Sequence, residues 1–114
     1  MGSSETQASD IYTSLQRGDS QTQARVWSDY YLLIIRTAKQ KLGGFPCRAF
    51  DEEDIALAVL HDFFNAVRLG KIYRWNDVME LRCLLRAMTH NMVSVFRRRE
   101  MRAKRGGGNV RGGS

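Results

Sequence analysis

Apolar residues recur at three- and four-residue steps along three long segments of this chain, and residues that start or stop helices bound each segment. In segment 20–42 the steps fall at positions 24, 27, 31, 34, 38 and 42, and Gly43-Gly44 with Pro46 end the pattern. Ser20 with Gln23 three residues later is a capping-box signature for its start. This segment is therefore predicted to be a helix.

Two further segments follow the same rule. Segment 51–70 opens with acidic residues, which suit the positive end of a helix dipole, and closes at Gly70. The next segment opens with Asp77 and Glu80, a second capping-box signature, and nothing stops its pattern before Gly106. With a short helix over 11–17 and a single proline in the chain, the patterns predict an all-α fold. We expect a compact bundle of three to four helices with a long basic C-terminal helix.

The expected domain spans residues 10–105. Residues 1–9 are predicted to be a disordered N-terminus, and residues 106–114 a Gly-rich flexible linker or tail. The last helix would be about 40 Å long at about 1.5 Å per residue. That is longer than the core of so small a domain covers, so its final turns are expected to project.

The formal net charge of +6 lies entirely after Phe96. The residues before that point carry equal numbers of acidic and basic side chains, whereas the end of the chain holds a single acid, Glu100. The basic residues there are Arg97, Arg98, Arg99, Arg102, Lys104, Arg105 and Arg111. A neutral body with a basic arm is typical of a protein that binds a polyanion at one end. The alternative is that the arginines only solvate a helix end.

Aromatic and basic residues alternate in the loop before Asp77, at Tyr73, Arg74, Trp75 and Asn76. Rings that stack on unpaired bases, beside cations that contact phosphates, are what single-stranded nucleic acid requires. An amide such as that of Asn76 can also hydrogen-bond a base edge. In the alternative interpretation the two rings cover the core, and the loop is only a connection.

The segment 51–67 is apolar on two sides. Beside the residues of its core stripe it carries Leu57, Leu60 and Phe64, close to Asp54 and His61. A helix of this kind is either deeply buried or contacts a partner. The acidic rim favours a protein partner that presents arginines.

Several classes of function are disfavoured. The sequence has no Gly-rich phosphate loop at the start of a helix and no Ser/His/Asp or Cys/His arrangement, so we do not expect an enzyme. Neither histidine has a second ligand at metal spacing, and we expect no metal and no cofactor. The two cysteines form no CxxC pair, and no run of residues is apolar enough to cross a bilayer, so we expect a reduced cytoplasmic protein without membrane contact.

Four markers occur in order along the chain. They are Leu-x-x-Gly-Asp at 15–19, Lys-Leu-Gly-Gly at 41–44, Asp-Glu-Glu-Asp at 51–54, and Arg-Arg-Glu-x-Arg-x-Lys-Arg-Gly-Gly-Gly at 98–108. Together they resemble region two of a bacterial RNA polymerase sigma factor of the extracytoplasmic-function class, in particular the variety common in planctomycetes. The resemblance covers roughly residues 10 to 108. Members of that class also carry a second helical domain, which reads the −35 element and is not part of the resemblance.

The resemblance implies three contact surfaces. The helix 51–67 would dock on the clamp helices of the largest subunit of core RNA polymerase, through Asp51, Glu53, Asp54, Leu57, Leu60, His61 and Phe64. The loop would capture a flipped base of the promoter −10 element, through Tyr73, Arg74, Trp75 and Asn76. The last helix would hold the non-template strand, through Arg97, Arg98, Arg99, Arg102, Lys104 and Arg105.

The resemblance also allows an anti-sigma factor as a further partner. Where many relatives have a polar pair, this chain has Leu57-Ala58, so its polymerase contact is expected to be more apolar. Two other functions stay open on the residues alone. One is a general nucleic-acid-binding helical module without polymerase contact, and the other is a helical protein-interaction domain.

Overall fold

A computed structural model describes the backbone of residues 3–43, 49–72 and 74–113, and the side chains of residues 10–43, 49–72 and 74–103. Four helices account for most of this part of the chain: α1 (Ser3–Gln16), α2 (Ser20–Leu42), α3 (Glu52–Arg68) and α4 (Val78–Gly113). The described residues contain no strand. The predicted all-α bundle is confirmed.

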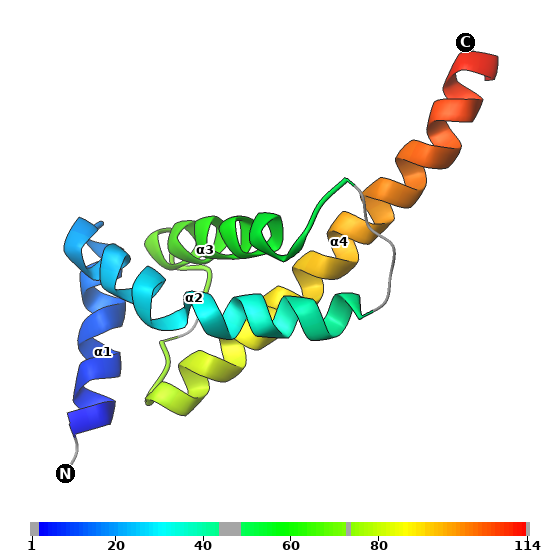
Figure 1. Ribbon diagram of the computed structural model, residues 1–114. Coiled ribbons are helices and arrows are strands. Elements are labelled where there is room, and N and C mark those ends of the chain that lie inside the picture. The colour runs from blue at the N-terminus through cyan, green and yellow to red at the C-terminus, as the bar shows by residue number, and fades with distance from the viewer. Residues whose placement is uncertain (1–2, 44–48, 73, 114) are drawn as a thin grey trace.

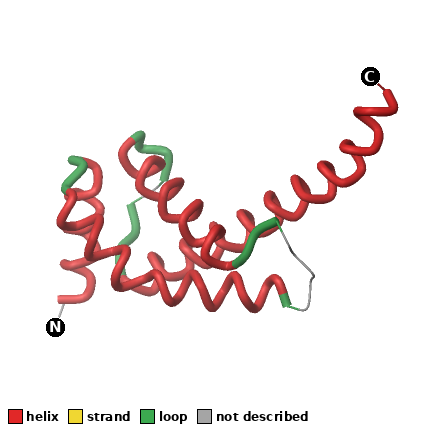
Figure 2. The backbone as a smooth tube through the Cα atoms, turned by 45° about the horizontal axis from the view of Figure 1, so that its top comes forward, coloured by secondary structure: helices red, strands yellow, loops and turns green. Residues whose placement is uncertain are grey.

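Helices α2, α3 and α4 pack against one another, and α1 closes one end of the bundle (Figure 1). The C-terminal part of α4 extends away from the opposite end, as the tube view in Figure 2 also shows. The molecule is therefore elongated, with extents of 61, 29 and 21 Å. Within the described residues, no helix combines the length and the apolarity that a membrane crossing needs.

The turn between α1 and α2 explains the Leu-x-x-Gly-Asp marker. Gly18, at φ +77°, donates its N–H to the Leu15 carbonyl at 3.0 Å, and the Asp19 N–H bonds the Ser14 carbonyl at 3.1 Å. This is a Schellman motif, which needs a residue that tolerates positive φ. Asp19 then caps α2 by accepting the Thr22 N–H at 3.1 Å. The cap expected at Ser20 therefore lies one residue earlier, because an aspartate there already satisfies the free N–H groups.

The starts of α3 and α4 follow the sequence pattern. Asp51 and Asp54 form a reciprocal capping box, each carboxylate accepting the backbone N–H of the other at 3.1 Å. Asp77 accepts the Glu80 N–H at 2.8 Å, and the Glu80 carboxylate accepts the Asn76 N–H at 2.8 Å. The predicted cap at Asp77 is confirmed.

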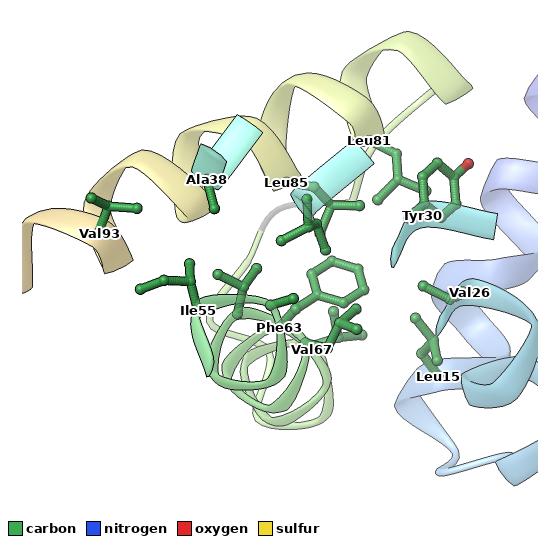
Figure 3. Close-up of a cluster of buried hydrophobic side chains, with 14 of the residues drawn as sticks. Leu15, Val26, Tyr30, Ala38, Ile55, Phe63, Val67, Leu81, Leu85 and Val93 are labelled. Carbon is green, nitrogen blue, oxygen red and sulfur yellow. The ribbon is translucent and has the colours of Figure 1, made fainter. Parts of the chain in front are cut away.

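The core lies between α2, α3 and α4, with the Phe63 ring near its centre (Figure 3). On α2 the buried aromatic position is Tyr30, with Val26 one turn before it, rather than Trp27 and Tyr31 as the periodicity predicted. The observed and the predicted buried positions are shifted by one residue in this part of α2, and large apolar or aromatic residues stand at both sets of positions. On α4 the sequence pattern missed Thr89, which is fully buried and donates its hydroxyl to the Leu85 carbonyl at 2.7 Å.

Both outer helices are longer than the sequence predicted. Helix α1 begins at Ser3 and so occupies most of the segment expected to be disordered. Residues 3–9 form no apolar stripe, but they also contain no glycine or proline that would break a helix. Helix α4 continues to Gly113, through the glycines expected to form a linker. A glycine costs about 1 kcal/mol relative to alanine inside a helix, so this last part is the least stable part of α4.

Candidate functional site

Apolar hollows flank the exposed side of α3. One, of about 650 Å³, lies between α3 and the C-terminal half of α4. Its lining includes Leu57 and His61 from α3 and Phe96 from α4. Another, of about 680 Å³, lies between α3 and the start of α2, and its lining includes His61 and Phe64 from α3 and Trp27 from α2. His61 borders both hollows, so α3 forms a ridge between two recesses that could receive side chains of a partner.

We name the exposed side of α3 the α3 ridge and define it by Asp54, Leu57, His61 and Phe64. Leu57 is 47% exposed on a helix whose opposite side is packed in the core. Phe64 is half-buried, with its ring centroid 5.7 Å from that of Phe63. The ridge thus presents large apolar side chains that a partner can contact while the core of the domain stays packed.

The N-terminal end of the ridge is acidic. The carboxylates of Asp51 and Asp54 are both engaged in the capping box and help to begin the helix. Glu53 is exposed and takes no part in that capping box. Of the acidic residues predicted to face the polymerase, Glu53 is therefore the one that can be changed without removing a helix cap.

Leu60 does not belong to the ridge. It is fully buried, together with Ala56 and Phe63. The structure places Leu60 in the core rather than on the surface predicted to face the polymerase, because three other helices pack on α3 and its buried side is wider than a single stripe.

Trp75 is also part of the core. It is 3% exposed, and its ring stacks on Phe63 at a centroid distance of 5.5 Å and meets Tyr12 edge-on at 5.1 Å. The structure thus places the Trp75 ring as the alternative interpretation of the loop has it, covering the core between Tyr12 of α1 and Phe63 of α3. Tyr73 lies outside the described residues.

Two predicted loop residues do reach the surface. Asn76 is exposed, while its backbone N–H is fixed by Glu80. Arg74 is exposed and donates from Nη2 to the Thr13 hydroxyl at 2.7 Å. The loop thus presents an amide on backbone that α4 holds through Glu80, and a guanidinium that α1 holds through Thr13.

The basic arm divides between two directions. Arg98 and Arg102 are exposed and lie one turn apart, on the side of α4 away from the buried Glu100. Arg97 is half-buried. Arg99 lines the hollow beside α3, with its guanidinium 5.6 Å from the Phe96 ring centroid. The side chains of Lys104 and Arg105 lie outside the described residues, although α4 continues through both positions.

The loop and the exposed arginines are at different places along α4. The helix rises about 1.5 Å per residue, so Asp77 and Arg98 are roughly 30 Å apart along its axis. A single polyanion must therefore span about 30 Å to contact both the loop and the exposed arginines.

No group of three or more His, Cys, Asp or Glu side chains within the described ranges could hold a metal ion. The candidate site therefore consists of an apolar ridge with an acidic end and of a separate polar and basic surface.

Residues 5–113 match the family described as ECF sigma factor. The chain belongs to this family. Neither a curated protein nor a solved structure matches it. ECF sigma factors are transcription regulators rather than a family of enzymes, and the family implies interaction with RNA polymerase and promoter DNA.

Four residues near the candidate surfaces were not assigned to a contact surface from the sequence. Trp27 and Phe96 form the outer walls of the two hollows beside α3. Both are large half-buried aromatics next to a doubly apolar helix, and that is the signal that could have found them. Tyr12 and Thr13, which contact the loop, lie more than fifty residues before it, and no local pattern indicates them.

Proposed function

We propose that this domain binds core RNA polymerase through the α3 ridge and single-stranded promoter DNA through the loop 70–77 and the exposed arginines of α4. In doing so it would recognise and open the −10 element at the start of transcription. The observation that carries the proposal is the separation of the two surfaces: the α3 ridge is apolar with an acidic end, and the positive charge gathers on the projecting end of α4.

The chemistry of the α3 ridge fits a helical partner that presents apolar and basic side chains. Leu57 and Phe64 give apolar contact area, and hollows on both sides of them can receive protruding residues. Glu53 at the acidic end would attract arginines of the partner and fix the orientation of docking. The clamp helices of the largest polymerase subunit are the partner we propose. An anti-sigma factor that covered the same ridge would compete with them.

The proposal for DNA rests on charge and on a constrained loop. The amide of Asn76 can donate to and accept from a base edge, and its backbone is held by Glu80. Arg98 and Arg102 lie on one side of α4, where both can contact phosphates of the same strand. With Trp75 in the core, the loop would hold a base by hydrogen bonds and charge, without help from that ring.

Opening of the duplex follows from preferential binding of one strand. Each base-pair step lost costs about 1.4 kcal/mol of stacking on average. A protein that binds the unpaired strand at two places about 30 Å apart recovers part of that cost and shifts the equilibrium towards the open state. Bacterial RNA polymerase works in the cytoplasm, which is where we propose this domain acts.

The decisive experiment replaces one exposed leucine on the ridge and one elsewhere. Leu57→Glu should abolish retention of the domain on immobilised core RNA polymerase, because it places a charge in the centre of an apolar contact. Leu32→Glu is the matched control: Leu32 is 60% exposed on α2, lines none of the hollows beside α3, and should leave retention unchanged. Circular dichroism melts should show both variants folded.

Equal retention of the two folded variants would exclude the α3 ridge as the polymerase contact. A wild-type domain that binds single strands with no retention on polymerase would instead support a general nucleic-acid-binding module.

A further inference from the structure

Helix α1 contacts the loop 70–77 through two adjacent residues. The Tyr12 hydroxyl donates to the Ile72 carbonyl at 2.9 Å, and the Thr13 hydroxyl accepts from Arg74 Nη2 at 2.7 Å. The Arg74 guanidinium also lies over the Tyr12 ring, 5.5 Å from its centroid. These contacts join the first helix to a loop about sixty residues later in the chain.

The Tyr12 ring and its hydroxyl do different things. The ring is buried and packs edge-on against Trp75, so it fills core space that a phenylalanine would fill equally well. The hydroxyl reaches past that core to the loop backbone, at a carbonyl two residues before Arg74. The ring therefore serves the core, whereas the hydroxyl serves the contact with the loop backbone.

Thr13 acts on a side chain rather than on the backbone. Its hydroxyl, together with the Tyr12 ring, fixes where the Arg74 guanidinium lies. An arginine that is free to rotate loses side-chain entropy when it binds, whereas one that is already oriented loses less. Holding Arg74 before DNA arrives therefore increases its contribution to affinity.

We propose that Tyr12 and Thr13 are positioning residues, through which α1 fixes the base-capturing loop in the conformation that binds the unpaired strand. They act through Ile72 and Arg74 and need not contact DNA themselves. At the other end of the loop, Glu80 holds the Asn76 backbone, so the loop is held from both sides. The inference rests on the proposed function of the loop.

The test removes single hydroxyls from the full chain. Tyr12→Phe keeps the ring and deletes the donor to Ile72, and Thr13→Val keeps the side-chain shape and deletes the acceptor for Arg74. Tyr31→Phe is the matched control, because it deletes a tyrosine hydroxyl from a half-buried ring on α2. Fluorescein-labelled twelve-nucleotide strands of oligothymidine, oligocytidine and oligoadenine serve as probes, and fluorescence anisotropy gives the affinity for each over a range of salt concentrations.

Tyr12→Phe should weaken binding to the best of the three strands by roughly two- to tenfold, the range expected for one hydrogen bond. It should also reduce the ratio between the best and the worst strand. The dependence on salt should stay that of the wild type, because the arginines of α4 are untouched. Backbone amides of residues 71–76 should exchange with solvent faster, while those of α2 and α3 should not. Tyr31→Phe should leave every one of these quantities unchanged.

Two outcomes would overturn the inference while leaving the proposed function of the loop intact. In one, Tyr12→Phe keeps the wild-type affinities and their ratio. In the other, it lowers affinity equally for all strands with no change in amide exchange of the loop. A wild-type chain that binds the three strands equally would overturn the proposed function of the loop and, with it, this inference.

Discussion

Replacing Trp75 with alanine distinguishes a core residue from a base-stacking residue. The ring is 3% exposed and lies between Phe63 and Tyr12, so the change leaves a cavity where the loop packs against α1 and α3. Buried Trp→Ala changes cost about 3–5 kcal/mol of unfolding free energy. A domain of this size has roughly 6–17 kcal/mol in total, so the variant should still fold but with a much smaller margin.

The expected loss can be read as a melting temperature. With an unfolding entropy of about 2.1 cal/mol/K per residue, a loss of 3–5 kcal/mol lowers Tm by roughly 12–21 °C. Circular dichroism melts and urea titrations measure the two quantities. Trp27→Ala is the control, because it makes the same chemical change at a half-buried ring on α2 and should cost less.

A surface position for Trp75 predicts a different result for the same variant. A surface ring that only stacks on bases would lose no more than about 0.5 kcal/mol of stability on truncation. It would instead lose about 1–3 kcal/mol of binding to single strands. An unchanged Tm together with such a loss would show that Trp75 is not packed in the core of the free domain and contacts DNA instead, and our placement of it would be wrong.

Three further outcomes follow from the structure. Arg98→Ala and Arg102→Ala should each lower the salt dependence of single-strand binding by about 0.7 in log–log slope, and an unchanged slope would remove that arginine from the DNA surface. Leu60→Ala should cost about 2–5 kcal/mol in urea unfolding because the side chain is fully buried, and a loss below about 1 kcal/mol would return it to the surface. Hydrogen bonds from the Thr22 hydroxyl and N–H hold the pKa of Asp19 below its usual value, so its stabilising effect is present at neutral pH and disappears as the pH falls through that lowered pKa. Thermal melts between about pH 2 and 6 should therefore show a smaller pH dependence for Asp19→Asn than for wild type, and equal slopes would contradict the cap.

The sequence predicted the helices better than it predicted their buried sides. The bounds of α2 and the cap at Asp77 depend on local chemistry, which the sequence contains directly. On α2, however, apolar residues occupy both Val26 and Trp27, so two registers satisfy the same periodicity. The packing of α3 and α4 decides between them, and that information is not local.

The placement of two candidate residues depends on packing in the same way. The sequence left open whether the Trp75 ring stacks on bases or covers the core, because the contacts that decide it come from Tyr12 on α1 and Phe63 on α3. The sequence pattern placed Leu60 on a second apolar side of α3. Whether that side is buried depends on how many helices surround α3, and in the structure Leu60 is fully buried. The exposure of Arg98 and Arg102, by contrast, agrees with the projection of the last turns of α4 that the length of this helix predicted.

The central claim is that one small domain carries two independent surfaces, one for polymerase and one for single-stranded DNA. The most direct measurement compares Leu57→Glu with an Arg98→Ala, Arg102→Ala double variant, each assayed separately for retention on core polymerase and for anisotropy with a labelled single strand. We predict that Leu57→Glu loses polymerase and keeps the strand, and that the double variant keeps polymerase and loses affinity for the strand. Parallel losses in both assays from either folded variant would contradict the claim, because they would mean that one surface serves both partners.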